Sequence, residues 1–290
     1  MRTPAGTVAF YAAAVITVLL IASAALALAI FLTVPRTADP LLSLSDNTWW
    51  FTYHDPPEEG SAGALWRIGA AMAAAVIAAA AAFQALALFR RNGSMLFPAL
   101  ILFLFSLGPE CLRAGTAYLY ASDGSISAIV VLTRMIYWAR FVGLLGLLLT
   151  GLYCIDFKYK RYGVLIAVIF LVSFAMAAYI PVDRTVFLIQ LTWKLGDEQG
   201  VWFMSLIIGA LALCTAAAAA PVKRSARYLW LAAGLLLLLA SRELLFFGAS
   251  PIILSAGLAA LTGGIMLSLR MVAALYAPAG GKKSVEGGTP

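Results

Sequence analysis

The sequence has 290 residues, of which 63% are hydrophobic and only 11% are charged, and its formal net charge at pH 7 is +7. Soluble domains typically carry about 25% charged residues, so this composition excludes a water-soluble protein and predicts one that lies almost entirely in a lipid bilayer. The basic residues form short clusters between apolar stretches rather than one continuous face, which argues against a nucleic-acid-binding protein.

Apolar stretches long enough to cross a bilayer recur along the whole chain. A membrane-spanning helix needs about 20 apolar residues. The stretches that meet this requirement are 8–33, 64–89, 95–120, 128–154, 163–181, 201–220, 227–248 and 250–275. They predict an all-α, polytopic membrane helix bundle of about eight transmembrane helices. The first stretch is about twice as long as the apolar part of a signal peptide, so we expect it to be a retained helix.

The break between the last two stretches is short. Only Gly248-Ala249-Ser250-Pro251 separates them, and a proline suits the first turn of a new helix. We therefore expect two helices here. If the break is only a kink within one helix, the number of spans falls to seven.

The basic residues of the connecting segments predict the orientation. Those on one side are Arg2, Arg90-Arg91, Lys158-Tyr159-Lys160-Arg161, Lys223-Arg224 with Arg227, and Lys282-Lys283. The other side carries most of the acidic residues, against Arg36, Arg67, Arg184 and Lys194. Because basic loops remain cytoplasmic, both termini are predicted to be cytoplasmic, in a bacterial-type inner (plasma) membrane.

Two parts of the chain match without gaps at an offset of 133 residues. Arg90-Arg91 aligns with Lys223-Arg224, and Glu110 aligns with Glu243. We therefore predict a four-plus-four repeat of like-oriented halves, 1–155 and 156–277, followed by a disordered cytoplasmic tail at 278–290. Parallel repeats of this kind occur in transporters, whose sites lie at the interface. The alternative is a chance match between two amphipathic membrane halves.

Ionisable and polar residues inside the predicted spans form the candidate ligand-binding site. Burying an ionisable side chain at mid-bilayer costs about 2.5–3.5 kcal/mol, so each needs a partner or a purpose. The candidate residues are Glu110, Arg113, Arg134, Tyr137, Arg140, Arg242 and Glu243. They comprise four arginines against two glutamates, and a buried arginine does not readily lose its charge.

The local sequence predicts how some of these residues are arranged. Glu110 and Arg113 are three positions apart and can pair on one helix face. Arg134 and Arg140 lie about 120° apart around a helix, which spreads positive charge over a broad arc. Pro109 cannot donate a hydrogen bond to the carbonyl group of Phe105, so we expect a kink and a free acceptor beside Glu110.

Three hypotheses remain open for this cluster. The functional hypothesis is a hydrated, outward-facing, arginine-lined cavity for an anionic group such as a lipid headgroup or a carboxylate, whose geometry suits the guanidinium fork. The structural hypothesis is that each glutamate pairs with an arginine and joins the two halves. The third is a proton relay through Glu110 and Glu243.

The leading functional prediction is a transport or translocation protein that handles an anionic or amphipathic solute between its halves. The alternatives are a sensor or assembly subunit that binds partner helices without transport, and a lipid-modifying enzyme. His54 is the only histidine, and the sequence contains no nucleophile motif, P-loop or dinucleotide-binding turn. We therefore lean against an enzyme, and we expect no metal site and no cofactor.

The expected partners follow from the same hypotheses. They are the lipid bilayer, an anionic small molecule or lipid, and another membrane protein, but no nucleic acid. Glycines are predicted to let helices approach closely. They are Gly143, Gly146, Gly151, Gly263 and Gly264.

Overall fold

The computed structural model describes residues 60–121, 125–157, 161–182, 188–189, 191–193, 195–248 and 250–276, together with Val15 and Ala22. In this part, seven helices are long and apolar enough to cross a membrane. The polytopic, all-helical prediction is therefore confirmed for the described residues. The predicted first span, 8–33, lies outside them apart from Val15 and Ala22, which are helical, and the predicted tail at 278–290 also lies outside them.

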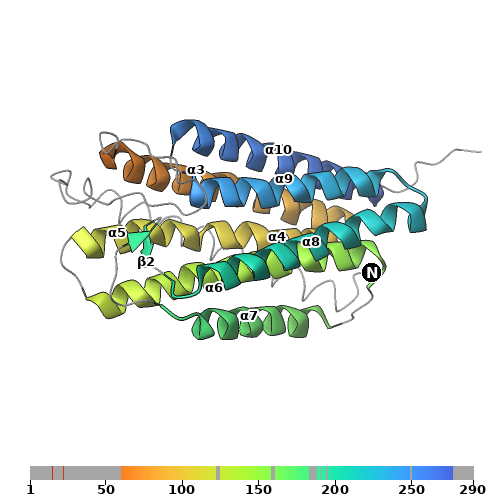
Figure 1. The fold of residues 1–290 in the computed structure, drawn as a ribbon. Coiled ribbons are helices and arrows are strands. Elements are labelled where there is room, and N and C mark those ends of the chain that lie inside the picture. The colour runs from red at the N-terminus through yellow and green to blue at the C-terminus, as the bar shows by residue number, and fades with distance from the viewer. Residues whose placement is uncertain are drawn as a thin grey trace, which may run out of the picture.

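The helices run side by side as a bundle (Figure 1), joined in one place by a two-stranded hairpin. In chain order the elements are α3 (Gly60–Asn92), α4 (Leu96–Leu107), the 3-10 helix η2 (Pro109–Leu112), α5 (Arg113–Ala121), α6 (Ile126–Cys154), α7 (Tyr162–Tyr179), β1 (Leu188–Ile189), β2 (Thr192–Trp193), α8 (Glu198–Lys223), α9 (Arg227–Phe247) and α10 (Pro251–Leu275). In the antiparallel hairpin between α7 and α8, Leu188 pairs with Trp193.

The span at 96–119 is interrupted where the proline predicts it. α4 ends at Leu107, and the chain continues through η2 into α5. The Gly108 N–H donates to the carbonyl oxygen of Phe105 at 3.1 Å, so the acceptor that Pro109 cannot serve is taken by the preceding residue. This tighter turn places Glu110 in the buried 3-10 segment.

The chain between α9 and α10 is a true break and not a kink. α9 ends at Phe247, and Gly248 adopts an extended conformation with φ −62° and ψ 129°. Pro251 occupies the first turn of α10, and the Ser250 side chain accepts a hydrogen bond from the Ile253 N–H. The two helices pack against each other, so the alternative of a single long span is excluded.

Glycines on α6 allow this helix to pack closely on two neighbours. A Cβ atom at Gly146 would lie 2.8 Å from the Cβ of Leu102 on α4, and one at Gly151 would lie 2.6 Å from the carbonyl oxygen of Ala212 on α8. Gly143 likewise faces the Ser106 side chain. The predicted close approach is therefore confirmed for the three α6 glycines, and α6 contacts α4, α7 and α8.

The two glycines of α10 differ from each other. A Cβ atom at Gly264 would lie 3.0 Å from the backbone nitrogen of Leu238 on α9, so this glycine permits close packing. A Cβ atom at Gly263 would meet no atom within 4 Å. The prediction of close approach is therefore wrong at Gly263, which faces away from α9.

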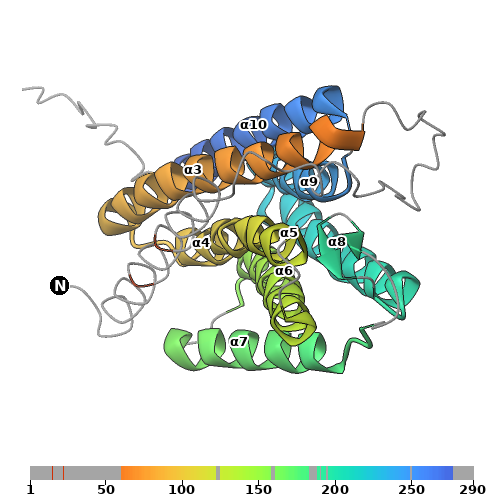
Figure 2. The same cartoon turned by 90° about the vertical axis from the view of Figure 1, so that its left-hand side faces the viewer.

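Figure 2 shows how the helices are layered. α3 and α10 lie on one side of the bundle and α7 on the other, with α4, α6, α8 and α9 between them. The largest group of buried apolar side chains lies along α3, α4, α6, α9 and α10. The buried charges lie where Glu110 of η2 meets Arg140 of α6 and Arg242 of α9.

Candidate functional site

A cluster of charged side chains is buried among α3, η2, α5, α6 and α9. Five of the seven predicted site residues belong to it or contact its members. They are Glu110, Arg113, Arg140, Arg242 and Glu243. They come from three places in the fold: the helix break at Pro109, the middle of α6 and the end of α9. The fold brings them together although they are up to 133 residues apart in the sequence.

Arg140 is the centre of the cluster and contacts both glutamates. Its Nη2 donates to the two carboxylate oxygens of Glu243 at 2.9 and 3.1 Å, and its Nη1 lies 3.6 Å from Oε1 of Glu110. The guanidinium group also lies over the ring of Phe246, 3.8 Å from the ring centre. Hydrogen bonds between two charged groups and the face of an aromatic ring both favour a buried cation, so Arg140 is well compensated.

Arg242 is compensated much less. Its side chain is 0% exposed, and the ion pair that the structure gives it joins Nε to Oε1 of Glu110 at 3.5 Å. Within the described part of the chain, neither Nη1 nor Nη2 of Arg242 has a hydrogen-bond partner. Glu110 must serve two guanidinium groups at once, because the same oxygen is also its contact with Arg140.

Two further buried arginines bind the end of α9. Arg113 donates from Nη2 to the carbonyl oxygen of Phe246 at 3.2 Å, and Arg67 donates from Nε to that of Gly248 at 2.9 Å. The last carbonyl groups of a helix lack partners within the helix and carry partial negative charge. Arg67 and Arg113 therefore stabilise the point at which α9 ends.

Arg67 was not among the predicted site residues. From the sequence, Arg67 was assigned to a connecting segment, whereas the structure places it inside α3 with a side chain that is 1% exposed. The signal that could have identified it is its position within the apolar stretch 64–89 rather than beyond its end.

Tyr137 and Arg134 lie on α6 but differ in position. Tyr137 is buried, and its ring packs edge-on against Phe246 with the ring centres 5.9 Å apart. It therefore lines the apolar side of the cluster. Arg134 is exposed, because the turn of α6 directs it away from the buried face that carries Tyr137 and Arg140. The broad arc of arginines predicted from the sequence therefore does not include Arg134.

The cluster keeps the charge imbalance predicted from the sequence, with a different fourth arginine. Among the described residues, Arg67, Arg113, Arg140 and Arg242 are buried, and the acidic residues of the cluster are two glutamates. Glu110 is also buried, and the Glu243 side chain, at 36% exposed, is the more open carboxylate. Backbone carbonyl oxygens of Phe246 and Gly248 accept hydrogen bonds from Arg113 and Arg67, whereas the contact that the structure gives Arg242 is one carboxylate oxygen that it shares with Arg140.

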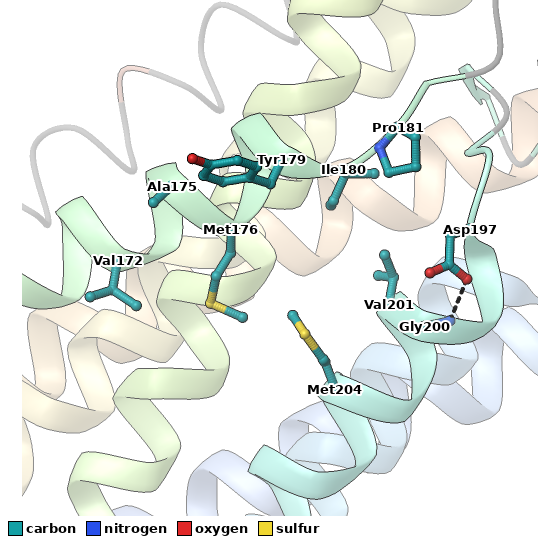
Figure 3. Close-up of a pocket in the computed structure, with 10 residues that line it drawn as sticks. All are labelled: Val172, Ala175, Met176, Tyr179, Ile180, Pro181, Asp197, Gly200, Val201 and Met204. Carbon is teal, nitrogen blue, oxygen red and sulfur yellow. Dashed lines mark hydrogen bonds between the residues drawn. The ribbon is translucent and has the colours of Figure 1, made fainter.

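A pocket lies elsewhere in the described part of the chain, between α7 and α8 (Figure 3), and no residue of the charged cluster lines it. The predicted arginine-lined cavity does not coincide with this pocket. Within the described ranges, no three His, Cys, Asp or Glu side chains gather closely enough to hold a metal ion.

Comparison with known proteins gives no relative from which a role could be transferred. No protein-family model, no curated protein and no solved structure matches the chain. The described helices nevertheless establish that this chain has the length and composition of a multi-pass integral membrane protein.

Proposed function

We propose that this membrane protein binds an anionic group, a carboxylate or a phosphate, at Arg242, and that it translocates an amphipathic solute that carries this group. The observation that carries the proposal is the fully buried guanidinium group of Arg242, whose two terminal nitrogens have no hydrogen-bond partner among the described residues. Its Nε lies 3.5 Å from a carboxylate oxygen that also serves Arg140.

The chemistry of arginine determines which ligand fits this position. A guanidinium group has five N–H donors, remains charged, and pairs with carboxylate or phosphate oxygens through two parallel hydrogen bonds. A buried charged donor without a partner is costly. A bound anion supplies the missing acceptors of Arg242, and it adds negative charge where Arg140 and Arg242 share one oxygen of Glu110.

The partly exposed Glu243 indicates how an anion reaches Arg242. It follows Arg242 directly in α9, and it holds Arg140 by two hydrogen bonds. Movement of the Glu243 carboxylate would open the cluster on the side where its side chain is already 36% exposed. The ligand then enters beside Phe247, whose ring centre lies 5.7 Å from the Arg140 guanidinium carbon.

Translocation is supported by the arrangement of the two halves that we infer from the sequence match. Glu110 and Glu243 are equivalent in that match, and both contact Arg140. In that match α3, α4 and α6 are equivalent to α8, α9 and α10. The packing of α3 on α4 corresponds to that of α8 on α9, and the packing of α4 on α6 corresponds to that of α9 on α10. The contact of α3 with α10 likewise corresponds to that of α8 with α6. A site at the boundary between parallel halves is typical of transporters built from repeats.

The proposed orientation agrees with the positions of the helix ends. α3 ends with Arg90 and Arg91 in its last turn, and Lys223 lies in the last turn of α8. Lys223 forms an ion pair with Asp156, which follows α6. The ends of α6 and α8 therefore lie together on one side of the bundle, which we propose faces the cytoplasm.

Thermal unfolding of the purified protein in neutral detergent tests the proposal. Dodecyl phosphate and dodecanoate are expected to raise the Tm of the wild-type protein, because a ligand that binds only the folded state at about 100 times its Kd stabilises it by about 2.7 kcal/mol. Dodecyl maltoside, with the same chain and no charge, is the control ligand. Inorganic phosphate distinguishes recognition of the charged group alone from recognition of an amphiphile.

The variants are Arg242→Met and, as a matched control, Arg134→Leu on the exposed face of α6. We expect Arg242→Met to abolish the shift caused by the anionic amphiphiles and Arg134→Leu to retain it. Equal shifts in wild type and Arg242→Met would exclude Arg242 as the binding group. If no anion raises the Tm of the wild-type protein, the ion pairs of the cluster only hold the helices together and the proposal fails.

A further inference from the structure

A groove separates α7 from α8 near the segment that joins them (Figure 3). Its volume is about 560 Å³, within the range of about 300–1,000 Å³ that is typical of small-molecule sites. Val172, Ala175 and Met176 line it from α7, and Val201 and Met204 line it from α8. In the figure, the side chains of Met176 and Met204 extend toward each other across the groove.

The groove exists because α7 stands apart from α8. α7 packs against α6, toward which its buried residues, among them Ser173 and Ala177, are turned. The rest of α7 is apolar and exposed, as at Leu171, which is 68% exposed, and Phe174, which is 62% exposed. Among the described helices none covers this surface, so in this part of the chain the groove between α7 and α8 is open to lipid chains.

The walls of the groove suit an unbranched hydrocarbon chain. Most of the surface that lines it is apolar, and methionine side chains adapt to the shape of an apolar guest. No described wall residue offers a hydrogen-bonding side chain between Met176 and Met204. Asp197 lies at one end of the groove beside Gly200, and the hydroxyl group of Tyr179 points away from it, toward Ala175 (Figure 3).

The end of the groove carries a negative charge. Asp197 is the only charged residue among the lining residues that the structure describes, and its side chain is exposed. One of its oxygens accepts a hydrogen bond from the Gly200 N–H at 2.8 Å, and among the described residues no hydrogen bond is given to the other oxygen. A carboxylate at the end of an apolar groove favours a headgroup with a positive charge over one that is only anionic.

We propose that this groove binds one acyl chain of a phospholipid whose ammonium-bearing headgroup faces Asp197. The lipid belongs to the leaflet on the side of the α7–α8 connection. The chain runs along the groove between Met176 and Met204, and the ammonium group approaches the carboxylate of Asp197. This site is separate from Arg242 and does not depend on the anion proposed there.

Native mass spectrometry of the full chain in mild detergent tests the proposal, with phosphatidylethanolamine and phosphatidylglycerol of identical acyl chains as probes. We expect the wild-type protein to bind the ethanolamine lipid more tightly. Ala175→Trp fills the groove and is expected to weaken binding of both lipids by about tenfold, which corresponds to 1.4 kcal/mol. Leu171→Trp, on the same helix but outside the groove, is the matched control and is expected to leave binding unchanged.

Asp197→Asn tests the headgroup separately. Asparagine retains the hydrogen bond at the start of α8 because it caps helices as well as aspartate does, but it removes the charge. We expect the preference for the ethanolamine lipid to disappear while the acyl chain still binds. Equal binding by Ala175→Trp and Leu171→Trp would overturn the acyl-chain site, and an unchanged preference in Asp197→Asn would overturn the assignment of the headgroup.

Discussion

Arg140→Leu is expected to lower the free energy of unfolding by about 3–5 kcal/mol, as is typical when one partner of a buried ion pair is removed. Arg140 contacts Glu243 at 2.9 Å and Glu110 at 3.6 Å. Loss of the Arg140 guanidinium group removes the ion pair that the structure gives Glu243. Of the two ion pairs given for Glu110, only the one with Arg242 remains. Reversible unfolding in mixed detergent micelles, followed by circular dichroism, measures the change.

Arg134→Leu is the matched control for this prediction. It makes the same substitution on the same helix six positions earlier, where the side chain is exposed. We expect a change within about 0.5 kcal/mol, as for surface positions in general. Equal losses in the two variants would mean that the destabilisation comes from α6 itself and not from the buried ion pairs.

Gly146→Ala is expected to destabilise the protein by about 1–3 kcal/mol through overpacking. A Cβ atom at this position would lie 2.8 Å from the Cβ of Leu102, 3.1 Å from the backbone nitrogen of Phe103 and 3.2 Å from the carbonyl oxygen of Ala99. Two of these three atoms are backbone, so a rotamer change cannot relieve the contact and α4 must move away from α6. The same unfolding measurement detects the loss.

Gly263→Ala makes the identical change where no atom lies within 4 Å of the new Cβ. We expect it to be neutral or to stabilise α10 by up to about 1 kcal/mol, because alanine favours a helix over glycine. If both substitutions have the same effect, helix propensity and not the contact between α4 and α6 determines the outcome at Gly146.

The helices and their breaks could be predicted from the sequence because lipid imposes simple rules on length and polarity. The interruption at Pro109 follows from the missing N–H of proline, and the break before Pro251 follows from the preference of proline for a first helical turn. Both are local effects. The structure adds that the Gly108 N–H takes the acceptor at Phe105.

The rotation of each helix about its axis could not be predicted in the same way. Apolar residues occur on every side of α6, so their pattern does not indicate which face meets the bundle. Arg134 and Arg140 were therefore assigned to one arc, whereas the structure turns Arg134 outward and buries Arg140. The direction of a side chain here is decided by packing partners that are distant in the sequence.

Arg113 shows a second limit of local reasoning. Its spacing from Glu110 predicts a pair on one helix face, and that local prediction gives no sign of a contact with another helix. The structure gives Arg113 hydrogen bonds to the carbonyl oxygens of Leu245 and Phe246. These acceptors become available only because α9 ends nearby, which depends on the tertiary fold.

Equilibrium binding of dodecyl phosphate, measured by isothermal titration calorimetry with the protein in neutral detergent, tests most directly whether Arg242 binds an anion. We predict one molecule bound per chain for the wild-type protein and for Arg134→Leu, and no measurable binding for Arg242→Met. Binding to Arg242→Met with unchanged affinity, or no binding to the folded wild-type protein, would contradict this account.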